Sequence, residues 1–158
     1  MGFVLVGFGF KVSAAPFHFA APDAYAGASS PIAGILATAS KAMGIIGLLR
    51  MLLIVAAPEA SEDGTVWLTL LGVLSLVTMT WGNIAALGST NPKRMLAYSS
   101  VAHAGYMLAA ITAIGAWNWD ASFAGDAGES AVAVLTALIF HLIVPVSYTH
   151  LTLPTIIT

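Results

Sequence analysis

Lys11 and Lys41 lie inside stretches that are otherwise too apolar to carry a charge, GFVLVGFGFKVSAAPF and PIAGILATASKAMGIIGLL. An ammonium group at mid-membrane depth costs at least about 2.5 kcal/mol, even on lenient insertion scales. Each lysine therefore needs a partner, a water-filled cavity or a function. Snorkelling to the membrane surface is difficult for Lys41, because it lies far from both ends of its apolar stretch. We interpret both lysines as candidate proton-carrying groups.

The composition is typical of a membrane protein. Hydrophobic residues make up 59% of the chain and charged residues 8%, with a mean hydropathy of +0.93, whereas soluble domains carry about a quarter charged residues. The net charge of -2 offers no basic surface for nucleic acid. The absence of cysteine excludes disulfides, iron–sulfur ligation and thiol chemistry within this chain. No cleavable signal peptide is expected, since no basic region follows Met1.

Turn residues divide the chain into apolar segments that predict an all-α integral membrane helical bundle of about five transmembrane segments. The segments are approximately 1–21, 29–57, 65–87, 92–117 and 129–145. Spanning about 30 Å of hydrocarbon takes about 20 residues. The second, third and fourth segments meet this length, whereas the fifth is short.

The first segment is expected to be broken at Pro16. A proline cannot donate a hydrogen bond to the carbonyl four residues earlier, which leaves the carbonyl of Val12 free beside Lys11. Broken helices at membrane depth recur in ion-coupled transporters. The alternative is a simple proline kink with no role in transport.

Lys41 shares one helix face with Gly34, Ala37, Thr38 and Gly44. Small residues at this spacing allow another helix to approach closely. Thr38 adds a hydroxyl one turn away. Desolvation in such a seam disfavours the charged form of a lysine, so Lys41 is suited to accept and release protons.

A polar stripe occurs on the fourth segment, where Ser99, Ser100, His103 and Tyr106 follow one another at i, i+1, i+4 and i+7. Histidine titrates nearest to neutral pH of all side chains. The stripe is therefore either a proton relay or a set of helix-packing hydrogen bonds.

Two further histidines lie in apolar surroundings. His18 sits between Pro16 and Pro22, where it either relays protons or bonds backbone groups that the break frees. His141 is alone on an apolar stretch and is interpreted as structural.

The distribution of charge predicts an orientation. Lys93 and Arg94 lie in the turn between the third and fourth segments, which the positive-inside rule places in the cytoplasm. The acidic loops then lie outside, and Arg50 is expected to snorkel. All acidic residues fall in loops or at segment ends, so no internal carboxylate is available to neutralise Lys11 or Lys41.

Two strings resemble subunit N of proton-pumping NADH:quinone oxidoreductase, respiratory complex I. GFGFKVSAAPFHFAAPDAYAGASSPIAGILATASK is similar to its broken seventh and its eighth helices, and NPKRMLAYSSVAHAGYML to the start of its tenth. The combination GFGFK…PFH…PDAY…G…TASK is specific, because the related M and L subunits and the homologous antiporter subunits usually differ around PDAY and TASK. One departure is Ala20, where the family often has Trp.

The resemblance implies a role for each matched position. Lys11 would correspond to the broken-helix lysine that holds and releases the pumped proton. Lys41 would match the eighth-helix lysine that links two half-channels. His103 and Ser100 fall in the tenth-helix motif, as a possible relay.

The resemblance also implies the setting of the chain. It would belong to a proton-translocating subunit in a prokaryotic plasma membrane, driven by quinone reduction elsewhere in the complex. The other membrane subunits and the lipid bilayer would be its partners, and no nucleic acid would bind. NADH (or another donor) and quinone would serve the whole complex. The chain itself would hold no cofactor and no metal, since it has no G-x-G-x-x-G fingerprint and no cysteine.

Two other classes remain open, a subunit of a multi-subunit cation/proton antiporter and an inert truncated fragment. Residues 1–145 are interpreted as a fragment of an antiporter-like proton-translocating membrane domain, covering roughly its seventh to eleventh helices. Residues 146–158 include SYTHLTLPT, which looks like a translated sequencing adapter, and are interpreted as non-native.

Overall fold

The computed structural model describes residues 2–55, 62–119, 132–141 and 143. The loop carboxylates Glu59, Asp120 and Asp126 fall outside these residues, as does the proposed non-native tail. The described elements are, in chain order, α1 (Gly2–Val12), α2 (Ala20–Gly27), α3 (Ser30–Ile35), a π-helical stretch (Leu36–Ser40), α4 (Lys41–Val55), α5 (Glu62–Leu87) and α6 (Pro92–Trp119). A shorter apolar helix covers Val132–His141. No strand occurs in the described ranges, so the predicted all-α fold is confirmed for them.

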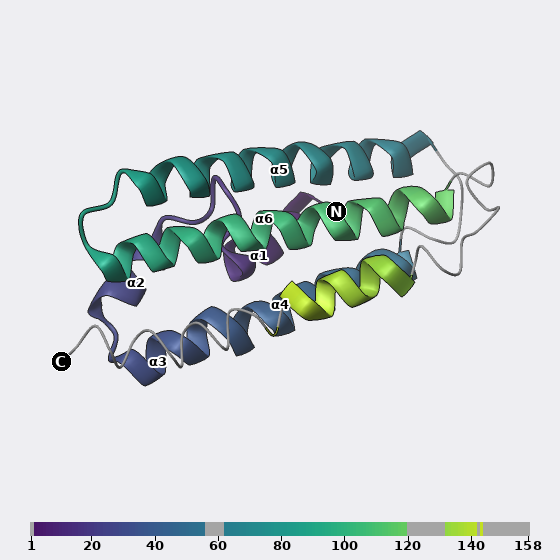
Figure 1. The fold of residues 1–158 in the computed structure, drawn as a ribbon. Helices are drawn as coiled ribbons and strands as arrows, with labels where there is room; N and C mark the ends of the chain where they lie inside the picture. Colours follow the sequence, from purple (N-terminus) through teal and green to yellow (C-terminus); the bar gives the residue numbers. More distant parts are fainter. Residues whose placement is uncertain (1, 56–61, 120–131, 142, 144–158) are drawn as a thin grey trace.

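The helices form an elongated bundle. Figure 1 shows α5 and α6 side by side along most of their length, with α3, the π-helical stretch and α4 running in succession across from them. The first helix, α1, packs against α4, and α2 packs against α6. The two halves of the first segment therefore contact different partners.

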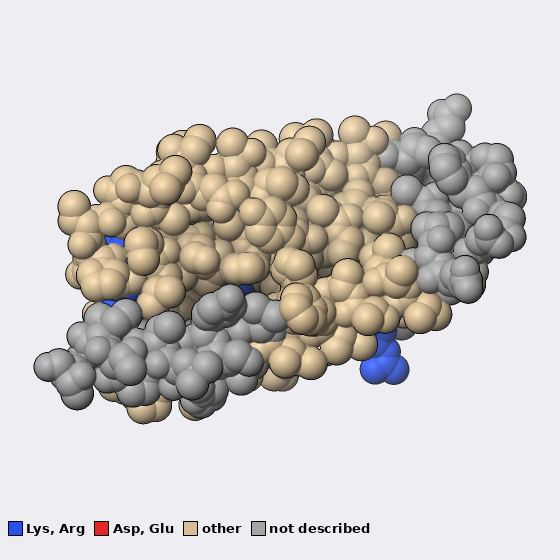
Figure 2. Space-filling model, in the orientation of Figure 1, with Lys and Arg blue, Asp and Glu red and all other residues tan. Residues whose placement is uncertain are grey.

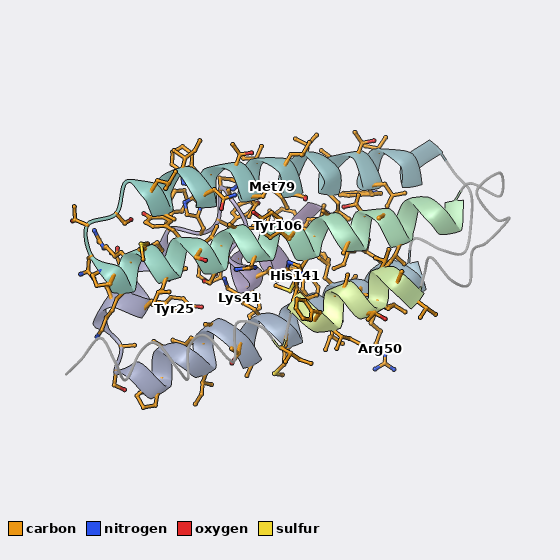
Figure 3. The ribbon with its side chains drawn as sticks, viewed as in Figure 1. Tyr25, Lys41, Arg50, Met79, Tyr106 and His141 are labelled. Carbon is orange, nitrogen blue, oxygen red and sulfur yellow. The ribbon has the colours of Figure 1, made fainter. Side chains whose placement is uncertain are left out.

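Two described stretches, Pro31–Leu52 and Val66–Leu87, are each long and apolar enough to span a membrane. The 28 residues of α6 are also long enough, but that helix carries the polar stripe and is not apolar enough by composition alone. Figure 2 shows a described surface that is almost entirely uncharged. Arg50 is exposed and projects away from the bundle (Figure 3).

The break in the first segment begins at Ser13 rather than at Pro16. Helix α1 ends at Val12, and Ser13 has a φ of 63°, a left-handed conformation that is uncommon for residues with a side chain. The helix has thus already ended when the chain reaches Pro16. The prediction of a broken helix is confirmed, but its local cause is the backbone of Ser13.

The second half of the segment extends to Gly27, beyond the predicted end near Ala21. The prediction assumed that Pro22 interrupts the helix. Instead Pro22 lies in the first turn of α2, where a backbone N–H has no intrahelical partner and its absence removes no hydrogen bond.

The break is held in place by α5. The backbone N–H of Ala15 donates to Thr78 Oγ1 at 3.1 Å, and the hydroxyl of Thr78 donates to the carbonyl of Leu74 at 2.5 Å. Thr78 is fully buried. A buried backbone N–H without a partner costs about as much as a lost hydrogen bond, so Thr78 stabilises the break.

Two glycines bring α5 and α6 into backbone contact. A Cβ atom on Gly82 would lie 2.6 Å from the backbone nitrogen of Ala102, and one on Gly105 would lie 2.6 Å from that of Met79. The hydroxyl of Ser75 donates to the carbonyl of Gly105 at 2.9 Å in the same region. This contact, typical of membrane helices, fixes the position of the polar stripe on α6.

Candidate functional site

Lys41 is the centre of the site. It begins α4 and is only 3% exposed. Its ammonium donates to two acceptors of the buried residue Ser100 on α6, the carbonyl oxygen at 2.6 Å and Oγ at 2.8 Å. The prediction of a lysine enclosed between helices is confirmed. Its specific partner is the serine of the predicted polar stripe.

A π-helical stretch, Leu36–Ser40, immediately precedes Lys41. Such wide turns often occur at functional sites. The hydroxyl of Thr38 donates to the carbonyl of Gly34 at 2.9 Å, within its own helix. No hydrogen bond joins the side chains of Thr38 and Lys41 among the described residues, and the acceptors of the ammonium come from Ser100.

The small-residue face around Lys41 is confirmed. Gly34, Ala37 and Gly44 are buried together with the lysine. A Cβ atom on Gly44 would lie 2.9 Å from Val12 Cγ2 at the end of α1. Gly44 thus admits α1 one helical turn after Lys41.

Lys11 is exposed, contrary to the expectation of a buried lysine. Its Cγ atom would lie 3.3 Å from a Cβ on Gly44, so its aliphatic stem packs near the site. Within the described ranges its ammonium makes no hydrogen bond or ion pair. The physical reason is that one face of α1 packs on α4, while Phe3 and Phe10 on α1 are exposed.

The ion pair that the structure describes lies at the end of the bundle, away from both lysines. Asp23 on α2 pairs with Arg94 at the start of α6, and the ammonium of Lys93 lies 3.5 Å from the carbonyl of Ala28. No carboxylate contacts Lys11 or Lys41 in the part of the chain that the structure describes.

His103 lies in a cluster of rings. Its ring centroid is 5.7 Å from those of Tyr106 and His141. Asn83 on α5 donates to the Tyr106 hydroxyl at 3.0 Å. His103 Nδ1 is buried without a hydrogen-bond partner among the described residues. The stripe is therefore partly a packing surface and partly turned toward Lys41.

His141, which the sequence analysis interprets as structural, packs against the ring of His103 on α6. Its ring also lies 5.9 Å from that of Tyr106, because the helix Val132–His141 comes back alongside α6. Local sequence offers no signal for this contact between two distant segments.

His18 is buried at the break and packs among aromatic rings. It is 8% exposed and stacks on Phe19, with ring centroids 5.4 Å apart, and lies 6.1 Å from the ring of Trp81 on α5. Its Nδ1 atom has no hydrogen-bond partner in the described part of the protein. It does not bond the freed backbone groups, and no contact with Lys41 is described for it.

Tyr25 was missed by the sequence analysis. It lies on α2, is 8% exposed and packs in a buried cluster with Ala37 and Ala97. Figure 3 shows Tyr25 and Lys41 near one another, between α2, α4 and α6.

An apolar helical bundle with ionisable side chains enclosed between its helices is characteristic of a membrane domain that handles ions or protons. The chain matches, over residues 1–155, the family described as NADH:quinone oxidoreductase/Mrp antiporter, transmembrane. It belongs to that family.

Named relatives narrow the similarity to subunit N. NADH-quinone oxidoreductase subunit N 2 of Roseiflexus castenholzii is 49% identical over 129 residues, which are 82% of this chain and 24% of that protein. Subunit N of Heliobacterium modesticaldum is 52% identical over 105 residues, 66% of this chain and 22% of that protein. Subunit N of Chlorobium chlorochromatii is 49% identical over 110 residues, which are 66% of this chain and 21% of that protein. The resemblance found in the sequence is confirmed.

The chain therefore spans about a quarter or less of the length of these curated relatives.

Proposed function

We propose that this chain is part of a proton-translocating membrane subunit of a quinone oxidoreductase that uses NADH or another donor, and that Lys41 carries the proton. The observation that carries the proposal is the setting of Lys41. Its ammonium is buried and bonded to Ser100, and no carboxylate contacts it within the described ranges.

The neutral acceptors of Lys41 favour a transferable proton. A carboxylate beside an ammonium stabilises the charged form, and a buried ion pair is costly to break. A serine hydroxyl and a carbonyl satisfy the hydrogen bonds of the ammonium without supplying a counter-charge. The proton on Lys41 is thus held less firmly than in an ion pair, which suits a group that must release it in each cycle.

The other candidates take places around this group. Lys11 is the proposed second proton carrier, since its stem packs at Gly44, one turn from Lys41. Ser100 holds the proton donor, and His103 is the proposed next group along the path. His18 remains a minor candidate, supported by its burial and its free Nδ1 atom.

The proposed setting follows from the same assignment. The partners are other membrane subunits and the lipid bilayer, with the Lys93–Arg94 turn on the cytoplasmic side of a prokaryotic plasma membrane. NADH or another donor and quinone react elsewhere in the complex. This chain holds no cofactor of its own. The names of the bacterial relatives support the proposal.

The test is Lys41→Met in the complete subunit, within the complex that contains it. Methionine keeps much of the volume and removes the charge. We expect normal assembly and a loss of most NADH-driven proton translocation into vesicles. Arg50→Met is the matched control, because it removes a charge from the same helix at an exposed position. Near-normal translocation in an assembled Lys41→Met complex refutes the proposal, and failure to assemble makes Lys41 a structural partner.

A subunit of a cation/proton antiporter is the second candidate, favoured by the description of the family, which includes Mrp antiporters. Such a protein would exchange cations for protons along a pH gradient without any electron donor. Cation-dependent collapse of an imposed pH gradient in vesicles, with no response to NADH, would select this alternative. Neighbouring genes for quinone oxidoreductase subunits would select the first.

A further inference from the structure

The π-helical stretch Leu36–Ser40 ends directly before Lys41. A π turn holds one residue more than an α turn, and single π turns inside α-helices recur at functional sites. The backbone hydrogen bonds around this one are irregular, because the N–H of Lys41 donates to the carbonyl of Thr38, only three residues earlier. The position of Lys41 on its helix therefore depends on where the extra residue is accommodated.

Packing fixes the helix on both sides of this region. At its start, Ala37 lies in a buried cluster with Ala97 on α6. After it, a Cβ atom on Gly44 would lie 2.9 Å from Cγ2 of Val12 on α1. The residues that can turn without disturbing these contacts are those between Ala37 and Gly44, and Lys41 is among them.

Moving the π turn past Lys41 would turn this residue and leave both fixed contacts in place. Each residue of an α-helix advances about 100° around the axis and about 1.5 Å along it. With the extra residue after Lys41 instead of before it, Lys41 would take the half-buried place that Ala42 now has. Ser40 would take the present place of Lys41, and the ammonium would leave Ser100.

The move requires little space. The residues beside Lys41 that turn with it are Ala39, Ser40 and Ala42, whose side chains are all small. Small side chains at a helix interface let neighbouring helices stay close. The helix contains one π turn before the move and one after it, so the backbone loses no hydrogen bond overall.

We propose that the π turn moves past Lys41 during the transport cycle and so turns the lysine away from Ser100 and back. This inference rests on the proposed function of Lys41 as a proton carrier. The protonated lysine makes charge-assisted hydrogen bonds with two acceptors of Ser100, and such bonds are roughly twice as strong as neutral ones. Release of the proton to the next group on the path weakens them and frees the side chain to turn. Lys41 then accepts its next proton in different surroundings, as alternating access requires.

Two single-residue deletions in the complete subunit test this inference, because each removes the extra residue on one side of Lys41. Deletion of Ala39 leaves an uninterrupted α-helix with Lys41 held at Ser100. Deletion of Ala42 leaves the same helix with Lys41 turned away and Ser40 in its place. The two variants are matched, since each loses one alanine that is not fully buried. We expect both to assemble and both to lose most NADH-driven proton translocation.

Electron cryo-microscopy of the two complexes gives a readout that a merely structural role of the π turn would not change. The side chain on the helix face opposite Ser100 should be Lys41 after deletion of Ala39 and Ser40 after deletion of Ala42. Near-normal translocation in the Ala39 deletion overturns the inference, because a lysine locked at Ser100 would then be sufficient. Failure of both variants to assemble also overturns it, since a helix without the extra residue should fit between the same two contacts.

A pair of leucine substitutions tests the movement without changing the length of the helix. Ser40→Leu fits the present arrangement, in which Ser40 is half-buried, and blocks the other, in which this position faces α6. Ala39→Leu is the matched control, because Ala39 is exposed and would move only to the present place of Ser40. We expect Ser40→Leu to lose most translocation and Ala39→Leu to keep it. Equal translocation in the two variants overturns the inference.

Failure of this inference can be told apart from failure of the proposed function. If Lys41→Met itself translocates normally, the proposed function fails. If Lys41→Met is inactive while the Ala39 deletion and Ser40→Leu are active, Lys41 carries the proton without turning, and the movement alone is refuted.

Discussion

Gly105→Ala is expected to push α5 and α6 apart at the contact that positions the polar stripe. The added Cβ would lie 2.6 Å from the backbone nitrogen of Met79 and 3.0 Å from its Cα. The obstacle is backbone, so no side-chain rotation can relieve it. The helices must move for the variant to fold.

The magnitude follows from these distances. Ordinary van der Waals contact begins at 3.4 Å, so the helices must separate by about 1 Å, a gap that forfeits up to about half of the dispersion energy of the atoms involved. Overpacking of this kind costs about 1–3 kcal/mol. The gain in helix propensity from Gly to Ala is about 1 kcal/mol. The difference is a net destabilisation of up to about 2 kcal/mol.

Gly72→Ala is the matched control on the same interface. A Cβ there would meet only Thr112 Cγ2, at 3.7 Å, which is ordinary contact. Its stability should be unchanged or slightly higher. The assay is the thermal midpoint at which the subunit is lost from the purified complex. The Gly105→Ala midpoint should fall, and the Gly72→Ala midpoint should not.

The same displacement should affect proton translocation. Ser100 lies on α6 little more than one turn before Gly105. It accepts hydrogen bonds from the ammonium of Lys41 at its carbonyl oxygen (2.6 Å) and at Oγ (2.8 Å). A shift of about 1 Å would take these distances beyond hydrogen-bonding range. Equal midpoints and equal translocation for the two alanine variants would refute the role given to the α5–α6 contact.

Three further predictions follow from single contacts. Lys11→Ala should abolish most NADH-driven proton translocation while assembly stays largely normal. Lys11→Arg should not restore translocation fully, because a guanidinium does not release its proton. Normal translocation in the assembled alanine variant would remove Lys11 from the proton path. Thr78→Val should lower the thermal midpoint by the equivalent of about 1–3 kcal/mol, because the N–H of Ala15 loses its acceptor. Thr78→Ser should keep the midpoint of the unmodified protein. An unchanged midpoint in the valine variant would contradict the role given to Thr78. Arg94→Gln should change stability by less than about 1 kcal/mol, since its ion pair with Asp23 is exposed, and a salt-independent loss larger than this would show a buried role.

The surroundings of Lys41 could be predicted because a helix face is a local property. Residues three and four apart lie on one side of a helix, so Gly34, Ala37 and Gly44 were placed correctly around it. Its partner Ser100 stood on the predicted polar stripe. The pairing itself joins segments that are far apart in the chain, and spacing within one helix carries no information about it.

Other features depend on backbone details that residue types do not reveal. The left-handed conformation of Ser13 ends α1, although serine has no special preference for it. Tyr25 escaped attention because Pro22 was taken as the end of its segment. The burial expected for Lys11 came from its apolar neighbours in sequence, whereas the structure packs only one face of α1.

The two faces of α6 make packing and proton chemistry depend on one another. One part of this helix presents Ser100 to Lys41, and another brings Gly105 into backbone contact with α5. The polar stripe makes α6 less apolar than the spanning stretches Pro31–Leu52 and Val66–Leu87. Polar groups in a membrane are tolerated where neighbouring helices cover them, so α6 needs close partners on both sides. A substitution at Gly105 should therefore alter the environment of Lys41 although the two residues are not in contact. If α4 alone formed the site, a substitution on α6 would leave Lys41 unaffected.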